Sequence, residues 1–545
     1  MQVPVLVVGA GPVGLALAGD LGWRGVNTLL VERTDGAVTQ PKMDMVGIRS
    51  MEFCRRWGIT DWVESAGYNR HYTQDCAWVT DLNGYEFGRE PFPAPADEKP
   101  PPHSPQHRER CPQNFFDPVL TRFAVENGSD IRYNTELVDF TDLGDRVVAV
   151  VRDADGTTSE IECQYLIGTD GGGSRVRDKL GIEMTGDGVL TYTTNAVFRC
   201  DGLESLHHTK AAYRYIFIGE EGTWATLVAI NGKDQWRFSL IGDGDRRLVS
   251  EEEMRTAIVR AVGREFDFEI LSMLPWVRRQ LVADHYRSGR VFLAGDSAHL
   301  TSPTGGFGMN TGLLDAVNLS WKLAAVLDGW GGETLLDSYE TEQRPVAIRN
   351  VTEAGDNLKR MLQPRVAKPE AAVFAGDSAE ATQARKEYGQ RYTEMMAREW
   401  FTIGIHLGYL YEGSPVIVPD GTPAPELTVS TYTPTARPGS RAPHVWLSPQ
   451  RSTLDEFGLR FALLRFDAAA DAGPLLAAAQ AGSVPIRLVD VDSAEAAALY
   501  EKPLVLVRPD GQVAWRGDDA ADAAAIVETV CGLRGTDRTS ETAVK

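Results

Sequence analysis

Three glycines near the amino terminus are spaced as G-x-G-x-x-G, a pattern that can bind a diphosphate. They are Gly9, Gly11 and Gly14, and a helix-like segment begins at Pro12. In such a segment the first glycine allows a sharp turn, the second leaves the backbone open to a diphosphate, and the third lets a helix pack against a strand. The N–H groups at the helix start then face the phosphates. The spacing predicts dinucleotide binding and leaves open whether the ligand is NAD(P) or FAD.

An acidic side chain stands where the ribose of a dinucleotide needs a hydrogen-bond acceptor. Glu32 follows the second of two short apolar runs, 5–8 and 27–31, and Arg33 comes next. This order of elements indicates a nucleotide-binding unit more specifically than the glycines alone: a strand, the glycines, a helix, a second strand and the acid. The alternative is a glycine-rich turn in another α/β fold.

Two more glycine clusters each follow an apolar run further along the chain. Their residues are Asp170, Gly171, Ser174 and Arg177 in the first cluster, and Gly295, Asp296, Pro303, Gly305, Gly306, Gly308, Met309, Asn310 and Gly312 in the second. A glycine run that closes onto a helix start forms an anion site from backbone N–H groups. If a flavin ring lies there, these groups can stabilise the negative charge of its reduced pyrimidine edge. Asp296 can then accept hydrogen bonds from the ribityl chain.

The composition is that of an ordinary globular protein and argues against several functions. The chain has 545 residues, of which 43% are hydrophobic and 24% charged, and this length allows roughly three or four domains. Its formal net charge of −21 disfavours nucleic acid and anionic membranes as partners, because phosphate groups repel such a surface. The six cysteines include no C-x-x-C pair, so we expect no metal site, no disulfide framework and a cytoplasmic location. We expect no transmembrane segment and no signal peptide.

The elements that must position these residues are an alternation of strands and helices, followed by a β-rich region. Helices are expected at 12–21, 49–59, 113–128 and 311–327, and a hairpin is expected to turn at Asp155-Gly156. The proline-rich segment 83–112 is expected to be an exposed loop or crossover. Strand-like runs dominate 182–284, which indicates a largely β insertion. After a linker at 412–440, the last part of the chain has the order β-α-β-β-β-α.

In these motifs the chain resembles the group A flavoprotein aromatic hydroxylases, which have the p-hydroxybenzoate hydroxylase fold. The family's FAD glycine motif with its acid, its D-G motif and its G-D motif correspond to the three clusters. The run GDSAHLTSPTGGFGMNTGLLDAVNLSWKL matches the family nearly residue for residue. The resemblance covers residues 1 to about 346, and it is closest to the longer phenol-hydroxylase-like members such as pentachlorophenol monooxygenase.

Two positions depart from the family pattern. Gln113 in the segment RCPQ resembles a glutamine that contacts FAD, but Asp117 in the following DPVL stands where a glutamate is usual. Lys42 stands where arginine is common. If that position contacts a cofactor phosphate, the bidentate geometry of arginine is lost.

The resemblance implies an α/β fold with three parts. A discontinuous FAD-binding domain of the Rossmann-like type is expected at 1–75, 108–181 and 285–411. A mostly β substrate domain is expected to be inserted at 76–107 and 182–284. After the linker 412–440, residues 441–545 resemble the thioredoxin-like C-terminal domain of the longer members. Cys531 is the only cysteine in it, so thiol exchange is excluded. We expect this domain to be structural, packing on the FAD domain or on a second subunit of a homodimer.

The resemblance also implies an enzyme that uses FAD, NAD(P)H and O2 to hydroxylate an aromatic small molecule. In the family, NAD(P)H docks transiently and reduces the flavin, O2 adds to form a C4a-hydroperoxide, and its distal oxygen passes to a phenolic ring. Water must be excluded, because the hydroperoxide otherwise decays to H2O2. One alternative is the same fold acting on a polyketide or antibiotic, by epoxidation, Baeyer–Villiger oxidation or inactivating hydroxylation. A second alternative is a flavin-binding protein without turnover.

Single residues receive roles from the same resemblance. The expected cofactor-binding residues are Gly9, Gly11, Pro12, Gly14, Glu32, Arg33, Arg49, Gln113, Asp170, Gly171, Arg177, Gly295, Asp296, Pro303, Gly306, Gly308, Met309 and Asn310. Pro303, Arg237 and Arg49 are expected to serve catalysis: Pro303 through its carbonyl at the ring face, Arg237 as a cation that favours reduced flavin, and Arg49 through the cofactor and the D-G aspartate. Candidates for the substrate pocket are Tyr213, Arg214, Tyr215, Trp224 and Trp236, with core packing as the alternative. For Arg237 the alternative is a solvated strand arginine, and for His299 we favour a structural role bonded to backbone over catalysis.

Overall fold

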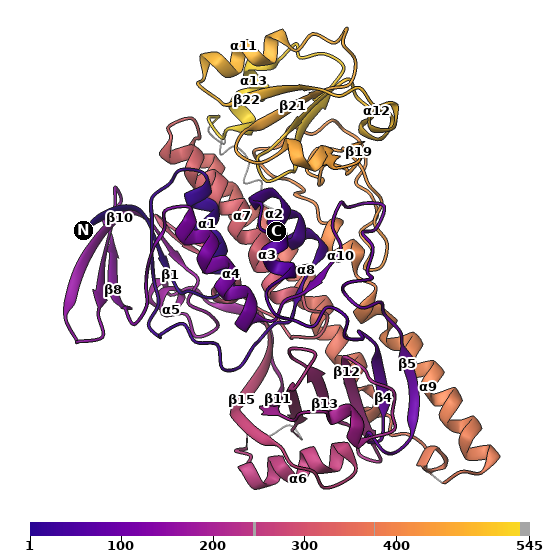
Figure 1. Cartoon of the computed structure of the whole chain (residues 1–545). Helices are drawn as coiled ribbons and strands as arrows, with labels where there is room; N and C mark the ends of the chain where they lie inside the picture. The colour runs from indigo at the N-terminus through magenta and orange to yellow at the C-terminus, as the bar shows by residue number, and fades with distance from the viewer. Residues whose placement is uncertain (243–246, 375, 535–545) are drawn as a thin grey trace, which may run out of the picture.

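A parallel β-sheet forms the centre of the first domain in the computed structural model, which describes residues 1–242, 247–374 and 376–534 (Figure 1). Its parallel strands, in spatial order, are β17 (Val291–Leu293), β10 (Thr158–Gly168), β1 (Gln2–Val8), β2 (Thr28–Val31) and β7 (Asp130–Arg132). Antiparallel strands β16 (Arg287–Ser288), β8 (Glu136–Asp142) and β9 (Val147–Arg152) extend it. Residues 5–8 of β1 and all of β2 are buried, as expected for strands covered on both faces.

Helices cover this sheet and carry the glycine motifs. They are α1 (Pro12–Trp23), α2 (Ile48–Trp57), α3 (Thr60–Glu64), α4 (Gln113–Glu126), α5 (Arg175–Leu180) and α7 (Phe307–Leu327). Helix α1 packs against both α4 and α7. This places the glycine turn at the start of α1 beside the loop that precedes α7. The predicted helices at 12–21, 49–59, 113–128 and 311–327 are all present, and the hairpin turn at Asp155-Gly156 joins β9 to β10.

A second, strongly curved sheet lies at the opposite end of the molecule from the C-terminal domain (Figure 1). Its strands, in spatial order, are β18 (His299–Leu300), β15 (Glu269–Ala283), β11 (Met184–Arg199), β14 (Gln235–Ile241), β13 (Gly222–Ala229), β12 (Arg214–Gly219), β4 (Cys76–Val79) and β5 (Glu86–Glu90). Helix α6 (Glu251–Val262) lies at its outer end, and η1 (Leu203–Leu206) precedes β12. Residues 182–284 are therefore largely β, as the strand-like runs predict.

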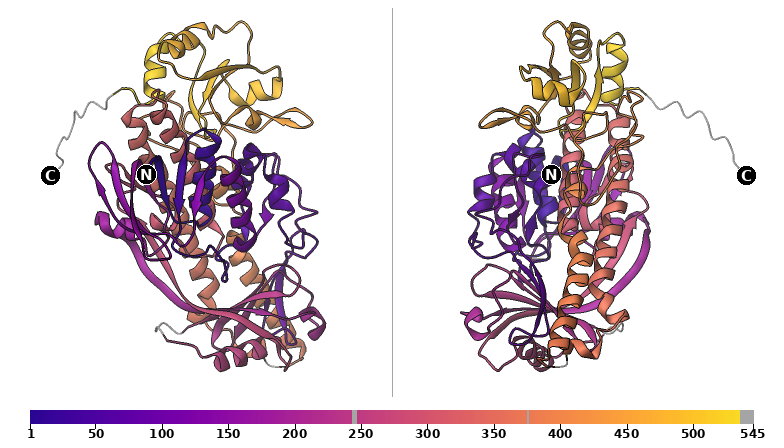
Figure 2. Two further views of the ribbon diagram at one scale, coloured as in Figure 1. Left: turned by 60° about the vertical axis from the view of Figure 1, so that its left-hand side comes forward. Right: turned by 90° about the vertical axis from the view of Figure 1, so that its right-hand side faces the viewer.

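One long helix links the two sheets. Helix α8 (Glu333–Val366) starts beneath the C-terminal domain and runs to the second sheet, where it contacts β13 and β15 (Figure 2). Helix α9 (Ala379–Trp400) lies beside it and packs on β5, and η3 (Ala371–Phe374) and α10 (Ile403–Leu407) flank α9. Within the described residues, no helix combines the length and apolar character needed to cross a membrane.

The C-terminal part contains a small mixed sheet. Its elements are β19 (Trp446–Ser448), β20 (Arg451–Ser452), η4 (Thr453–Glu456), β21 (Phe461–Arg465), α11 (Gly473–Ala481), β22 (Ile486–Asp490), α12 (Ala494–Tyr500), β23 (Leu504–Val507), β24 (Val513–Gly517) and α13 (Ala523–Val530). The order is β22-β21-β23-β24, with β21 parallel to β22 and antiparallel to β23. Residues 535–545 of the expected domain lie outside the described residues. Helix α12 was not predicted, because its run of alanines gives little amphipathic pattern.

A segment expected to be an exposed loop or crossover, and the expected linker, are both partly buried. The proline-rich segment 83–112 contains β5 and the short β6 (Glu109–Arg110), which pairs with β3 (Met45–Val46), and Ser104 in it is buried. The expected linker 412–440 has no helix or strand, yet Ser414 and Val416 are buried in it. Proline and glycine mark irregular backbone, which tertiary contacts can still bury.

Candidate cofactor and substrate sites

Segments far apart in the sequence meet in a recess at the carboxyl ends of β1, β2 and β10. Its lining residues include Gly9, Gly11, Glu32, Arg33, Gln113, Asp170 and Gly171 from the predicted cofactor set, together with Lys42, Asp117 and Gly173. In open parallel sheets this is where ligands bind. The structure thus brings together residues from the first two glycine clusters and the RCPQ segment.

The glycines of this recess differ in what surrounds them. A Cβ added at Gly11, Gly171 or Gly173 would meet no atom within 4 Å, so these positions border open space. A Cβ at Gly14 would lie 2.0 Å from the carbonyl oxygen of Gly9. Gly11 therefore leaves room for a ligand, and Gly14 permits close packing of α1. This is the division of roles that the G-x-G-x-x-G spacing predicts.

Two further features fit a nucleotide with a diphosphate. Gly11 is the N-cap of helix α1 and provides no side-chain cap. The first turn of α1 contains no acidic residue, so its free N–H groups are available to an anion. Glu32 is held in place, since Oε2 accepts from the N–H of Ala10 at 3.0 Å and Oε1 accepts from the N–H of Thr34 at 2.9 Å. A carboxylate retains acceptor capacity for a ribose hydroxyl.

The D-G motif braces the loops around the recess. Asp170 accepts hydrogen bonds from the Ser174 hydroxyl and from the N–H groups of Arg175 and Val176, which fixes the start of α5. Arg177 donates to the carbonyl of Ser297 at 3.2 Å and so ties α5 to the G-D loop.

Asp117 is a titratable group in the wall of this recess. Burial raises the pKa of its carboxyl to about 7, although a hydrogen bond from Gln113 Nε2 (3.0 Å) and the charge of Lys42 oppose the shift. Gln113 Oε1 in turn accepts from the N–H of Lys42 at 3.1 Å. Asp117 is thus largely protonated below neutral pH.

A second recess lies between the loop before α7 and the curved sheet. Its walls include Asp44, Phe92, Arg108, Arg110, Tyr213, Arg214, Arg237, Trp276, Arg278, Pro303, Gly305, Gly306, Glu399 and Trp400. It encloses about 1140 Å³, including space open to solvent. Lys42 lines both recesses, so the two adjoin at this residue. Pro303, Gly306, Arg237 and Tyr213 thus line one recess.

Asn310 fixes the loop that carries Pro303. Its Oδ1 accepts from the N–H of Gly47 and from the Ser50 hydroxyl, both at 2.7 Å, and its Nδ2 donates to the carbonyl of Gly306. Gly306 has φ +68° and caps α7, a conformation that glycine adopts without strain. Gly308 and Met309 occupy the first turn of α7. Gly295 and Asp296 form the short helix η2 (Gly295–Ser297) beside it.

Arg237 belongs to a charged network at the recess wall. Its Nη2 lies 3.3 Å from Asp44 Oδ2, and its Nη1 donates to the carbonyl of Pro41 at 2.9 Å. Arg110 donates to Asp44 Oδ1 at 3.0 Å, and the Tyr213 hydroxyl donates to Oδ2. Burial would raise the pKa of Asp44, but the two arginines lower it below its ordinary value. The interpretation of Arg237 as a solvated strand arginine is therefore wrong.

Three of the aromatic substrate candidates do not line the recess. Tyr215 and Trp236 are buried in the core beneath the sheet, and Trp224 lies in the same core against Phe217. The reason is the strand period of two: neighbours on a strand face opposite sides. Since Arg214 and Arg237 face the recess, Tyr215 and Trp236 must face away. Core packing, the alternative prediction, describes these three residues.

The expected role of Arg49 is also corrected by its contacts. Arg49 donates from Nη1 to Glu52 at 2.7 Å, from Nε to the Tyr409 hydroxyl at 3.0 Å, and from Nη2 to the carbonyl of Asp510 at 2.8 Å. It makes no described contact with Asp170 and lines neither recess. Its side chain joins α2 to the C-terminal domain.

His299 has a structural role. Its Nε2 lies 2.8 Å from Asp315 Oδ2 in the buried core, and Asp315 also accepts from the N–H of Gly295. Burial would lower the pKa of His299, but Asp315 raises it above its ordinary value. The partner is a carboxylate and not the backbone that we expected.

Several residues of the second recess were not predicted. They are Phe92, Arg108, Arg110, Trp276, Arg278, Glu399 and Trp400. The alternation in β15 places Leu274, Trp276 and Arg278 on one face, so that part could have been inferred from the period of two. Glu399 and Trp400 end a helix distant in sequence, and no local pattern relates them to the recess.

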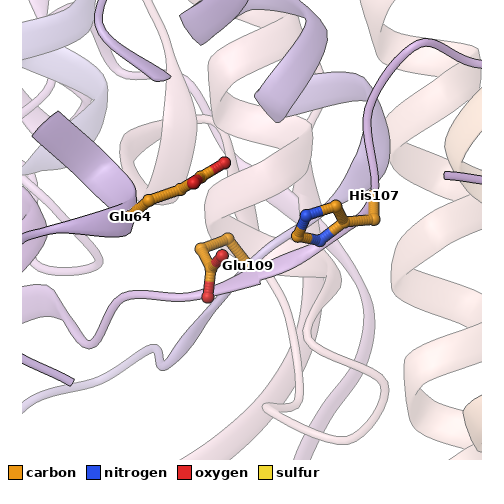
Figure 3. A group of neighbouring side chains, drawn as sticks. All are labelled: Glu64, His107 and Glu109. Atoms are coloured by element: carbon orange, nitrogen blue, oxygen red, sulfur yellow. The ribbon is translucent and has the colours of Figure 1, made fainter. Parts of the chain in front are cut away.

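One side-chain cluster has the spacing of a metal site. Ligand atoms of Glu64, His107 and Glu109 lie within 4.8 Å of one another (Figure 3). Arg70 bridges the two carboxylates at 3.2 Å and 2.8 Å and supplies the positive charge that a metal would. The cluster belongs to neither recess.

Comparison with known families matches most of the chain. The family described as FAD binding domain matches residues 2–354, and the family described as aromatic-ring hydroxylase, C-terminal, matches residues 435–533.

Individual relatives align along nearly their whole length. The chain is 32% identical to 4-methyl-5-nitrocatechol 5-monooxygenase of a Burkholderia species, over 96% of this chain and 95% of that protein. It is similar to the solved structure of RebC with bound 7-carboxy-K252c, with TM-score 0.91 and 37% identity over 98% of this chain and all of that chain. It is also similar to aklavinone-11 hydroxylase in complex with FAD and aklavinone, with TM-score 0.81 and 30% identity over 97% of this chain and 99% of that chain.

Proposed function

The chain belongs to the family of FAD-dependent aromatic-ring hydroxylases, and from this premise we propose that it inserts one oxygen atom of O2 into a phenolic ring with NAD(P)H as reductant. The observation that carries the proposal is that the two recesses adjoin, with Lys42 in the wall of both. A cofactor whose diphosphate lies at Gly11 can therefore extend its ring toward the second recess. Bound FAD supplies the hydride acceptor and activates O2.

The first recess provides groups of the right chemistry for each part of FAD. We assign the diphosphate to the start of α1 at Gly11, and a ribose hydroxyl to Glu32. The loop from Pro303 to Asn310 is assigned to the ring, because it contains the start of α7, which has no side-chain cap and whose first N–H groups have no partner within the helix, and because Asn310 anchors it to α2. Asp296 is assigned to the ribityl chain.

The second recess provides walls for an aromatic substrate and a polar group to orient it. Phe92, Trp276 and Trp400 offer ring contacts. Glu399 is buried, and its Oε1 is held by Arg214 at 2.7 Å and by the N–H of Gly305 at 3.3 Å. Its Oε2 makes no hydrogen bond to any described residue. We assign Oε2 as the acceptor for the substrate's phenolic O–H, because withdrawing that proton enriches the ring in electrons.

We infer that water is excluded once FAD and substrate fill the space between the same walls. The curved sheet, α9 and the Pro303 loop surround the space in which the ring of FAD would meet the substrate. A dry site strengthens the hydrogen bonds of Glu399 and protects the activated oxygen from loss to solvent.

A fused-ring substrate of polyketide type is the second candidate. The three aromatic side chains in the walls of the second recess, Phe92, Trp276 and Trp400, favour it, because a fused ring system can contact more than one of them at once. Aklavinone, which is bound in the aklavinone-11 hydroxylase structure described above, is an example of this class of compound.

The test is anaerobic reduction of the purified, yellow, FAD-loaded protein by NADH and NADPH, with single-ring phenols and with polycyclic phenols. We expect bleaching of the flavin absorbance that at least one phenol accelerates by about tenfold, since ligand-dependent closure controls this step in many enzymes. After oxygen is admitted, mass spectrometry should find one added oxygen in that phenol. A protein that binds no FAD, or whose FAD no nicotinamide reduces, would refute the proposal.

A further inference from the structure

Arg278 is a cation in the wall of the second recess, and the described residues provide no ion-pair partner for it. It lies on β15, one alternation beyond Trp276, and both side chains line the recess. Only 6% of the residue is exposed. Its neighbour Arg279 faces the other side of the strand and is exposed. The strand therefore delivers one arginine into the recess and the next one to solvent.

Arg278 differs from the other arginines of the recess in having no acidic partner among the described residues. Arg110 and Arg237 pair with Asp44, and Arg214 pairs with Glu399 at 2.7 Å. Among the described residues, Nε and Nη1 of Arg278 are buried without a hydrogen bond. A buried charge is unfavourable unless it is paired, so this guanidinium is prepared for a group that the chain does not provide.

The surrounding charges favour an anion. Six basic residues, Lys42, Arg108, Arg110, Arg214, Arg237 and Arg278, and two acidic residues, Asp44 and Glu399, are among the described residues that line the recess. Burial and the charges of Arg214 and Arg237 lower the pKa of Arg278 to about 10, while Glu399 opposes the shift. The guanidinium therefore stays protonated at neutral pH, and an incoming anion would relieve its repulsion from the other two arginines.

We propose that the substrate of this chain is an aromatic carboxylic acid and that Arg278 binds its carboxylate, which makes Arg278 a specificity-determining residue. This inference rests on the hydroxylase function proposed above and adds the acidic group to the phenolic ring. A single unpaired guanidinium matches a single negative charge, and its planar fork matches the two oxygens of a carboxylate. The aromatic walls formed by Phe92, Trp276 and Trp400 favour a ring-bearing anion over a free inorganic one.

Binding measurements on the FAD-loaded protein test this proposal. The probes are three acids, each paired with its primary amide: salicylate, 3-hydroxy-2-naphthoate and anthracene-2-carboxylate. The variants are Arg278→Met and the matched control Arg279→Met on the same strand. For at least one pair we expect wild type and the control to bind the acid about tenfold more tightly than the amide by calorimetry, as a charge-assisted pair adds about one order of magnitude. Arg278→Met should bind acid and amide within about threefold of each other.

Two results of these binding measurements would overturn the proposal directly, and a third would assign Arg278 to another ligand. If no acid binds wild type more tightly than its amide, or if Arg278→Met keeps the preference, the proposal is overturned. Inorganic phosphate and NADPH are the competing anions: a loss of NADPH affinity in Arg278→Met without a change in the acid-to-amide ratio would assign the residue to the reductant and overturn the proposal. Reduction of the wild-type flavin by NAD(P)H in that case would leave the hydroxylase function standing.

Thermal unfolding gives a test that needs no ligand. Because Arg278 is an unpaired buried charge, the ligand-free, FAD-loaded Arg278→Met variant should melt no lower than Arg279→Met. A lower melting temperature would mean that Arg278 stabilises the fold through its own contacts, which would overturn the proposal.

Discussion

Gly11 and Gly14 lie one helical turn apart at the start of α1, but a methyl group added at each would meet different surroundings. At Gly11 it would project into open space, and at Gly14 it would lie 2.0 Å from the Gly9 carbonyl. We expect Gly11→Ala to leave the stability of the FAD-free chain unchanged and to weaken FAD binding about tenfold, or about 1.4 kcal/mol. Gly14→Ala should destabilise the fold itself by about 3 kcal/mol. FAD titration and chemical unfolding of both variants check this. Equal loss of stability in the two would contradict it.

Asp117 gives a pH dependence with a defined sign. Its pKa is raised to about 7 from an ordinary 3.8 by burial, so the folded chain holds a proton that the unfolded chain releases. The stability that this proton confers is complete below about pH 4 and is lost as the pH rises toward 7.

The variant Asp117→Asn removes this dependence. Without FAD, we expect the variant to gain stability relative to wild type by roughly 2–4 kcal/mol between pH 4 and 8. Unfolding in urea across this range measures the difference. A difference that does not change with pH would show that Asp117 is ionised in the folded chain at low pH.

At the scale of elements, the curved sheet decides which aromatic side chains meet a ligand. Trp276 on β15 faces the recess, and Trp236 on β14 faces the core with 1% of its surface exposed. We expect Trp276→Leu to change stability little and to raise the dissociation constant of the most effective phenol by about threefold to tenfold, the value of one ring contact. Trp236→Leu should cost about 2–3 kcal/mol of stability, because a large core side chain is lost. Calorimetry and urea unfolding separate the two effects, and a binding defect in stable Trp236→Leu protein would contradict the assignment.

Helix α2 is the element that connects the ring loop to the rest of the chain. At its start, the N–H of Gly47 donates a hydrogen bond to Asn310. Further along the helix, Glu52 accepts hydrogen bonds from Arg49 and from Arg441. Burial would raise the pKa of Glu52, but the two arginines lower it to about 2. The cofactor loop is therefore linked through one helix to the C-terminal part.

At the scale of the whole molecule, the C-terminal domain and the helices of the FAD domain share a core and a set of buried charges. Trp321 on α7 and Leu335 on α8 pack in one cluster with Phe461 and Leu506. Arg508 donates to both oxygens of Glu342 at 2.6 Å and 2.9 Å, and all of these side chains are buried. This supports the prediction of a structural domain that packs on the FAD domain.

We expect the two parts to unfold together. Arg508→Met should lower the unfolding free energy by about 3–5 kcal/mol, because it leaves Glu342 buried with one cation fewer. The midpoint measured by flavin fluorescence should fall together with that measured by far-ultraviolet circular dichroism. Melting of the C-terminal domain alone, with the flavin still bound, would show that the domains are energetically independent. Lys502→Met, which removes a partly exposed ion pair with Asp518, is the control and should change little.

Local sequence determined the parts of this protein that depend on spacing along the chain. The glycine motif, its strand and helix, and Glu32 were all predictable, because a turn, a helix start and an acceptor at fixed offsets are properties of neighbouring residues. The helix after Pro303 and the β character of 182–284 follow from periodicity in the same way.

Tertiary structure alone decided which distant side chains share a cavity and which charges lack a partner. Arg49 stands where the family resemblance implies a cofactor contact. In the structure it donates a hydrogen bond to the carbonyl of Asp510, which lies 461 residues away in the chain. Trp236 was predicted to line the substrate pocket because it is aromatic, but strand pairing turns its side chain toward the core. Glu399 and Arg278 reach one recess from α9 and β15, and nothing local relates the two. The physical reason is that burial and pairing energies arise between segments brought together by folding, so they leave no pattern in the order of residues.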